Sequence, residues 1–225
     1  MEHSATTCSI LKTSILKKQL VALTALGLGL FITIHMLGNT LLFVGERAYN
    51  EYSHKLTSSP LIYVVEIGLL SIFALHCILT LTLAFENKKC RGQHKSSSFL
   101  QFNRKLGAWT SRNMVYTGLL VLAFVITHLI NFRFGPVYET SYDGVAMRNI
   151  YLLAQQKFHD PLYVIFYEAS LIILALHLSH GFKGLFQTLG FGSVLNIYIK
   201  RISLVFVLVL IFGFMSQPIY MYFFS

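Results

Sequence analysis

Residues 21–44 read VALTALGLGLFITIHMLGNTLLFV. This run contains no Asp, Glu, Lys or Arg, and it is longer than the about 20 residues that an α-helix needs to cross the hydrocarbon core of a membrane. Its one ionisable side chain is His35, and such a side chain is costly inside a membrane unless it has a partner or a function. The stretch therefore predicts a membrane helix that holds a candidate functional residue.

Four more apolar runs of similar length follow along the chain: residues 61–85, 113–134, 162–186 and 202–224. The chain is 55% hydrophobic and only 12% charged, about half the charged share of an ordinary soluble domain. The first run is long for the apolar part of a signal peptide, so we expect a retained helix. The sequence predicts an all-α integral membrane bundle of five transmembrane helices, forming one domain over residues 1–225.

The formal net charge is +9, and the basic residues gather on one side of the predicted membrane. Most of the 18 Lys and Arg side chains lie in the N-terminal tail, between residues 86 and 112, and between residues 183 and 201. Cytoplasmic segments of membrane proteins carry such an excess, which predicts a cytoplasmic N-terminus and an external C-terminus. Because the charges separate apolar runs, they indicate orientation and not nucleic-acid binding. The basic face either docks a partner or only sets the topology.

Five of the nine histidines fall inside the predicted helices: His35, His76, His128, His177 and His180. A single intramembrane histidine is readily explained by a hydrogen bond between helices. That explanation is strained when four successive helices each carry one, so these residues are candidates for a shared function.

Depth sorts four of these histidines into two levels. With a rise of about 1.5 Å per residue, His35 and His128 lie roughly 21 Å from the cytoplasmic ends of their helices. His76 and His177 lie roughly 13 Å from the same side, so the two levels are about 8 Å apart. Two levels of paired imidazoles are what two haems with histidine on both faces require. The sequence predicts these four side chains as iron ligands of an electron-transfer protein.

Other interpretations stay open at this point. Two histidines per level are too few for a zinc site, but a haem-free proton relay or transporter also uses intramembrane His and Glu. His180 lies three residues after His177, on nearly the same face of its helix. It is therefore a second candidate ligand, or a partner for a haem propionate together with Arg112 and Lys183.

Three stretches resemble the single-chain cytochrome b anchor, with five helices and two haems, of succinate dehydrogenases and fumarate reductases. They are Ile34-His35-Met36-Leu37-Gly38-Asn39, Ser111-Arg112-Asn113-Met114 with Thr127-His128-Leu129, and His177-Leu178-Ser179-His180-Gly181-Phe182. The resemblance extends in order and spacing from about Lys17 to Tyr222.

The resemblance implies two haem b groups and a bacterial cytoplasmic membrane. It implies a flavoprotein subunit and an iron–sulfur subunit on the cytoplasmic face, and a membrane quinone, often menaquinone, as substrate. His76 and His177 would hold the haem nearer those subunits, and His35 and His128 the farther one. Such a chain transfers electrons within a complex of the tricarboxylic acid cycle but does not oxidise succinate alone. The nearest alternative is the di-haem anchor of another dehydrogenase, such as a hydrogenase or formate dehydrogenase.

Three further positions bear on proton transfer. Some fumarate reductases of this type carry a glutamate two residues before the histidine that corresponds to His177, and this chain has Ala175 there. Glu66 and Glu168 lie inside predicted helices, each roughly 8–9 Å from the outer end. Both are candidates for exchanging protons with a quinone near the outer haem, or are polar residues bonded to a neighbouring helix.

Overall fold

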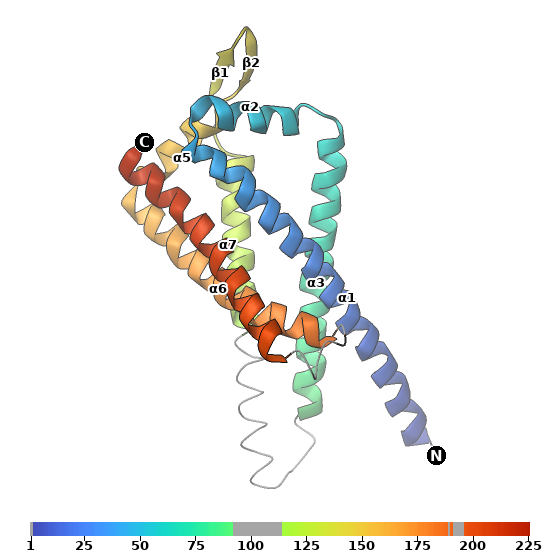
Figure 1. Cartoon of the computed structure of the whole chain (residues 1–225). Helices are drawn as coiled ribbons and strands as arrows, with labels where there is room; N and C mark the ends of the chain where they lie inside the picture. The colour runs from blue at the N-terminus through green and yellow to red at the C-terminus, as the bar shows by residue number, and fades with distance from the viewer. Residues whose placement is uncertain (1, 92–113, 189, 191–195) are drawn as a thin grey trace.

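The computed structural model describes residues 2–91, 114–188, 190 and 196–225 (Figure 1). Five helices are long and apolar enough to cross a membrane: Ile15–Phe43, Leu61–Lys88, Met114–Arg133, Pro161–Thr188 and Arg201–Phe224. The predicted all-α membrane bundle is confirmed, and the predicted spans differ from these mostly by a few residues at each end.

The first spanning helix begins earlier than the hydropathy predicted. Helix α1 (Glu2–Asn39) includes the basic tail before Val21 and continues into the 3₁₀ turn η1 (Thr40–Phe43). Gly45 follows with φ 128°, a conformation that favours glycine, and it turns the chain into α2 (Glu46–Thr57). Helix α2 lies across one end of the bundle and leads to the long α3 (Leu61–Arg91) (Figure 1).

The third spanning helix (Met114–Arg133) ends in the π-helical turn η2 (Leu129–Arg133), directly after His128. A short antiparallel hairpin, β1 (Glu139–Tyr142) and β2 (Val145–Arg148), and the short α5 (Ile150–Phe158) then precede α6 (Pro161–Thr188) and α7 (Asn196–Phe224). The hairpin was not predicted. Its two-residue turn is Asp143-Gly144, both with positive φ, which is the turn chemistry that joins tightly paired strands.

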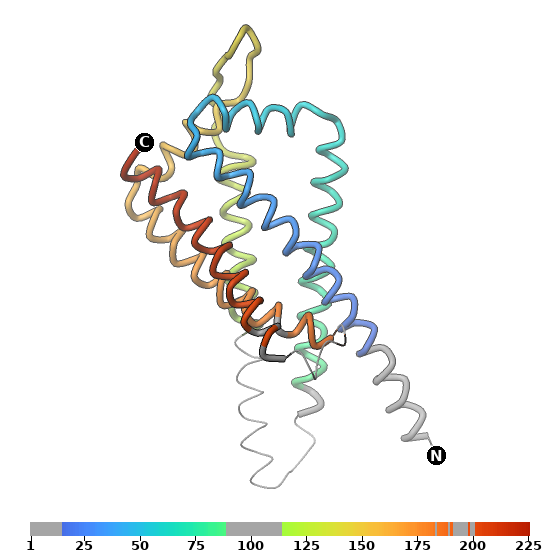
Figure 2. Tube along the Cα trace, viewed as in Figure 1, coloured from blue at the N-terminus to red at the C-terminus, as the bar shows by residue number. Residues whose placement is uncertain are grey.

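The two ends of the bundle are distinct (Figures 1 and 2). Helix α2, the hairpin, α5 and the C-terminus lie at one end, which we call the hairpin end. The opposite end, the N-terminal end, holds an ion pair between Lys17 of α1 and Glu86 of α3. Because this pair joins the start of one helix to the finish of the other, α1 and α3 run in opposite directions, as the predicted topology requires.

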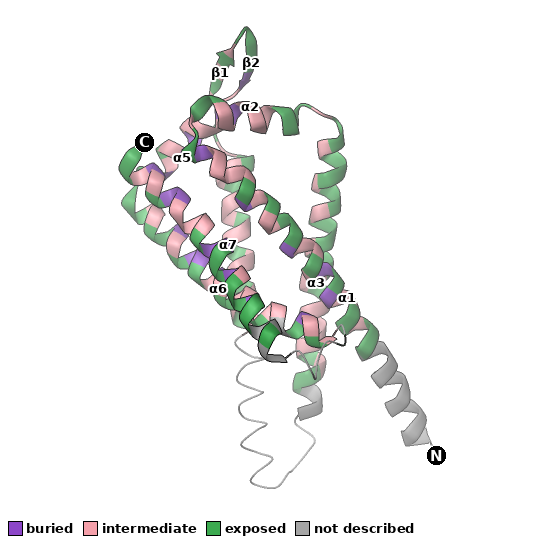
Figure 3. Ribbon diagram, viewed as in Figure 1, coloured by how far each residue is buried: buried purple, intermediate pink, exposed green. Residues whose placement is uncertain are grey.

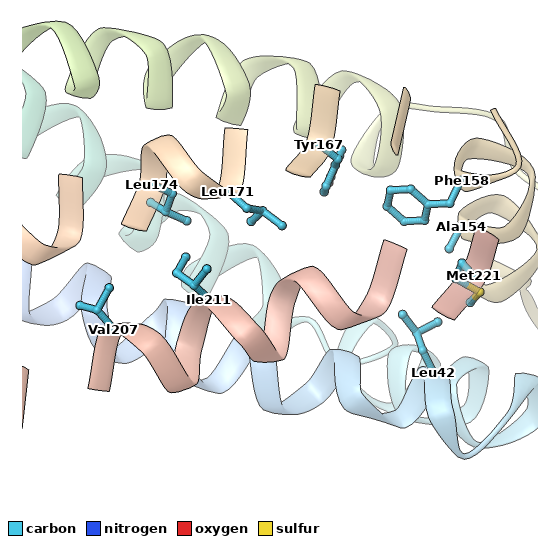
Figure 4. Packing of buried hydrophobic residues seen from close by; sticks show 9 residues of the cluster. All are labelled: Leu42, Ala154, Phe158, Tyr167, Leu171, Leu174, Val207, Ile211 and Met221. Atoms are coloured by element: carbon cyan, nitrogen blue, oxygen red, sulfur yellow. The ribbon is translucent and has the colours of Figure 1, made fainter. Parts of the chain in front are cut away.

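Helices α6 and α7 lie side by side, and α1 packs against both (Figure 2). A cluster of buried apolar side chains lies along this contact and continues into η1 and α5 (Figure 4): Leu42, Ala154, Phe158, Tyr167, Leu171, Leu174, Val207, Ile211 and Met221. At Gly213 of α7 an added Cβ would lie 2.5 Å from Sδ of Met36, so glycine permits the close approach of α1. Helix α3 is mostly exposed in the single chain, and its exposed side chains are largely apolar, as a lipid-facing surface requires (Figure 3).

Candidate functional site

His35 of α1 and His128 of the third spanning helix meet in the half of the bundle nearer the hairpin end. Their ring centres are 5.9 Å apart, and the ring planes are nearly perpendicular at 83°. The two residues are 93 positions apart in the chain, so the folding of the bundle alone brings them together. The depth estimate from the sequence placed them at one level, and the structure has them in contact there.

Aromatic rings surround this first pair. Phe31 stacks on His35 at 5.5 Å, and Phe132 lies 5.2 Å from the ring of His128. The hydroxyl of Tyr167, from α6, lies 2.5 Å from Nδ1 of His128. Buried rings of this kind exclude water and fix the orientation of the imidazole, which prepares its other nitrogen, Nε2, for a ligand.

A short chain of polar contacts reaches His35 from the hairpin end. Tyr49 of α2 donates to Oδ1 of Asn39 at 3.1 Å, and Nδ2 of Asn39 lies 3.4 Å from Nε2 of His35. Burial, and secondarily the neighbouring Tyr52, raises the pKa of Tyr49 above its ordinary value, so the phenol keeps its proton. The 3.4 Å contact between Asn39 and His35 is the longer and weaker of these two polar contacts.

His76 of α3 and His177 of α6, the second predicted pair, both lie in the half of the bundle nearer the N-terminal end. Each ring contacts a threonine from another helix. Nδ1 of His76 is 3.0 Å from the hydroxyl of Thr24, and Nδ1 of His177 is 3.3 Å from the hydroxyl of Thr117. Gly118 provides space for the second ring, because a Cβ there would lie 3.2 Å from Cε1 of His177.

The geometry of the first pair fits a haem with histidine on both faces. Two imidazoles that bind one metal through opposite faces have ring centres about 6 Å apart, since each metal–nitrogen bond is about 2 Å long. His35 and His128 have this spacing. Nε2 of His128 makes no hydrogen bond to any residue that the structure describes, whereas Nε2 of His35 lies 3.4 Å from the amide of Asn39, a contact that a metal ligand would have to replace. Within the described ranges there is no group of three or more His, Cys, Asp or Glu side chains that suits a bare metal ion. A two-histidine site suits a metal whose other ligands come from a macrocycle.

Of the three remaining candidates for contact with a cofactor, one does not join either histidine pair, and the side chains of the other two lie outside what the structure describes. His180 is exposed, and its Nδ1 contacts the carbonyl of Leu176 in its own helix at 2.8 Å. Arg112 lies outside the described residues, and Lys183 lies in α6 with its side chain outside the described part.

The two intramembrane carboxylates differ sharply in their contacts. Both oxygens of Glu66 accept hydrogen bonds from Arg133, at 2.9 and 3.1 Å. Both oxygens of Glu168 are buried and have no hydrogen-bond partner among the described residues. Glu66 is therefore held by a fixed cation, whereas Glu168 has two oxygens available for an exchangeable proton or a ligand.

Sequence reasoning missed the hydroxyl partners of the histidines: Thr24, Thr117 and Tyr167. Counted along the predicted helices, Thr24 and Thr117 lie only roughly 5–6 Å from the cytoplasmic ends, against roughly 13 Å for His76 and His177, so depth gave no signal for these contacts. No protein-family model, curated protein or solved structure matches this chain.

Proposed function

We propose that this chain is the di-haem cytochrome b membrane anchor of a succinate:quinone oxidoreductase or quinol:fumarate reductase. In this function it passes electrons between an iron–sulfur partner and a membrane quinone. The observation that carries the proposal is the contact between His35 and His128 from two helices, with His76 and His177 on two further helices at the other depth. The resemblance of the His35, His128 and His177 segments to that family narrows the proposal from any di-haem cytochrome to this one.

The chain's own residues would bind the haem iron and enclose the haem sites. Each bound haem would supply one-electron transfer, and two haems at different depths would carry electrons across the membrane. His35 with His128 and His76 with His177 would hold the two groups. Tyr167, Thr24 and Thr117 would fix the rings, and the aromatic side chains around the first pair would exclude water.

Glu168 is the better candidate of the two carboxylates for proton exchange with a quinone. Reduction of a quinone to a quinol consumes two protons, so a quinone site needs a group that takes up and releases them. The oxygens of Glu168 have no partner among the residues that the structure describes, whereas those of Glu66 are both engaged by Arg133.

The soluble partners would dock at the N-terminal end, which the charge distribution predicts to be cytoplasmic. A flavoprotein and an iron–sulfur subunit would carry out the chemistry on succinate or fumarate there. The chain by itself would then have no succinate dehydrogenase activity. In this account it belongs to a bacterial cytoplasmic membrane.

Affinity purification of the tagged chain from its native membrane tests the family assignment. We expect haem, a covalently bound flavin and iron–sulfur clusters in one complex that reduces a quinone with succinate. A complex with nickel or molybdenum and no flavin would indicate the anchor of a hydrogenase or formate dehydrogenase instead. A folded chain without a Soret band would indicate the haem-free proton channel or transporter.

A further inference from the structure

We propose that Thr24 and Thr117 are positioning residues that hold His76 and His177 as the tautomers protonated at Nδ1, with both Nε2 atoms ready to bind one iron. They would also keep the reduction potential of that haem lower than it would be without them. This inference rests on the proposed function, because it assigns a role toward one of the two haems.

The hydroxyl group of Thr24 donates its proton within its own helix, and this sets the direction of its hydrogen bond with His76. Oγ1 of Thr24 lies 2.9 Å from the carbonyl oxygen of Leu20 and 3.0 Å from that of Val21, and a carbonyl only accepts. The single hydroxyl proton is therefore used within α1, and the oxygen presents a lone pair to Nδ1 of His76 at 3.0 Å. The ring must donate, so the proton lies on Nδ1.

Thr117 contacts His177 in the same way on the opposite side of the site. Oγ1 of Thr117 donates to the carbonyl of Met114 at 3.1 Å and lies 3.3 Å from Nδ1 of His177. Nε2 of His177 makes no hydrogen bond to the described residues, and Gly118 leaves room beside the ring. Two threonines from different helices thus fix two histidines from two others in matching states.

This state is the one that iron binding requires. A histidine ligand binds through one ring nitrogen while the other donates its N–H to an outer acceptor, which sets the tautomer and makes the imidazole a stronger electron donor. A stronger donor stabilises ferric over ferrous iron, so the threonine contacts lower the potential of the haem. The first pair lacks this symmetry, since His35 contacts an amide and His128 a phenol.

The test is a redox titration of the haem-loaded protein carrying T24V or T117V, followed in the visible absorption bands. Valine keeps the shape of threonine but removes the acceptor. We expect each substitution to raise the midpoint potential of the same one of the two haems and leave the other unchanged. The serine variants, T24S and T117S, keep the hydroxyl and should restore the wild-type value. T33V is the matched control on α1, because the hydroxyl of Thr33 is bonded to the carbonyl of Gly29 in its own helix.

Two haems per chain with unchanged potentials in T24V and T117V would overturn this inference and leave the proposed function intact. A shift of equal size in T33V would also overturn it. Loss of one haem in T24V supports the inference if T24S regains it, and contradicts it if T24S does not. Wild-type protein without haem would remove the proposed function itself, and this inference with it.

Discussion

Glu168 is a carboxylate inside a spanning helix whose two buried oxygens have no hydrogen-bond partner among the described residues. A carboxyl group inside a membrane is costly without partners, and most such groups have a functional reason to be there. Glu66 has a partner in Arg133, which explains its presence in structural terms. For Glu168 no described residue gives an equivalent explanation, so its free oxygens point to a role in the chemistry.

Replacing Glu168 by glutamine should therefore lower quinone turnover by about 100-fold, the order of magnitude that a proton-transferring side chain contributes. The side chain keeps its shape and loses its exchangeable acid proton, so haem content should stay at the wild-type level. Steady-state quinone reduction by the intact complex measures the effect. Glu66→Gln is the matched comparison and should have the smaller effect. Unchanged turnover in Glu168→Gln would remove Glu168 from the mechanism.

The histidine pairs make a second residue-scale prediction, because two ligands of one iron should behave as a unit. His35→Ala and His128→Ala should each lose the same haem, and His76→Ala and His177→Ala should each lose the other. His180→Ala should retain both, since that ring is exposed and bonded to its own helix. Haem per chain, with the absorption maximum of the remaining haem, distinguishes the cases. Loss of a haem in His180→Ala together with its retention in His177→Ala would reassign the ligand.

Among the helices and strands, Arg148 joins the hairpin to the end of the third spanning helix. Its guanidinium donates to backbone carbonyls of the turn after His128: Phe132, Arg133, Gly135 and Pro136. The last carbonyls of a helix have no partner within it, so a cation there both satisfies them and complements the helix dipole. Burial, and then the nearby Arg133, lowers the pKa of Arg148 without discharging it at neutral pH.

Replacing Arg148 by methionine should lower the free energy of unfolding by about 2 kcal/mol, because several backbone carbonyls, two of them in part-buried contacts, lose a charged donor. Thermal unfolding in detergent, followed by circular dichroism, measures this loss. Arg47→Gln is the control, since Arg47 is exposed and pairs with Glu51 and Asp143 at the surface. An equal loss of stability in both variants would contradict the capping role of Arg148.

The elements also show where sequence reasoning worked and where it failed. Length and hydropathy predicted the five spans, because lipid imposes one strong rule on every spanning helix. The hairpin was not predicted, although Asp143-Gly144 is a turn sequence that favours a hairpin. The depth rule placed His35 level with His128, whereas the contact of Thr24 with His76 depends on how two helices are rotated, which depth does not give.

At the scale of the whole molecule, the structure has two chemically different ends. The N-terminal end carries the basic tail of α1 and the Lys17–Glu86 pair. The hairpin end carries α2, the hairpin and α5, which are tied together by buried Asn50 and Asn149, 2.9 Å apart through their amides. A compact cap at one end and basic segments at the other are consistent with a fixed orientation in the membrane.

Reporter fusions test that orientation. Alkaline phosphatase, which is active only outside the cytoplasm, should be active when fused after Ser225. A fluorescent protein fused before Met1 should be fluorescent, because it would remain in the cytoplasm. The opposite pattern would place the hairpin end inside and would invert the proposed docking face for the soluble subunits.

The most direct test of the central claim is a reduced-minus-oxidised spectrum of the purified chain with haem quantified per polypeptide. The two histidine pairs predict two b-type haems per chain, each bound on both faces and unreactive toward carbon monoxide. A folded chain that binds no haem would contradict the account.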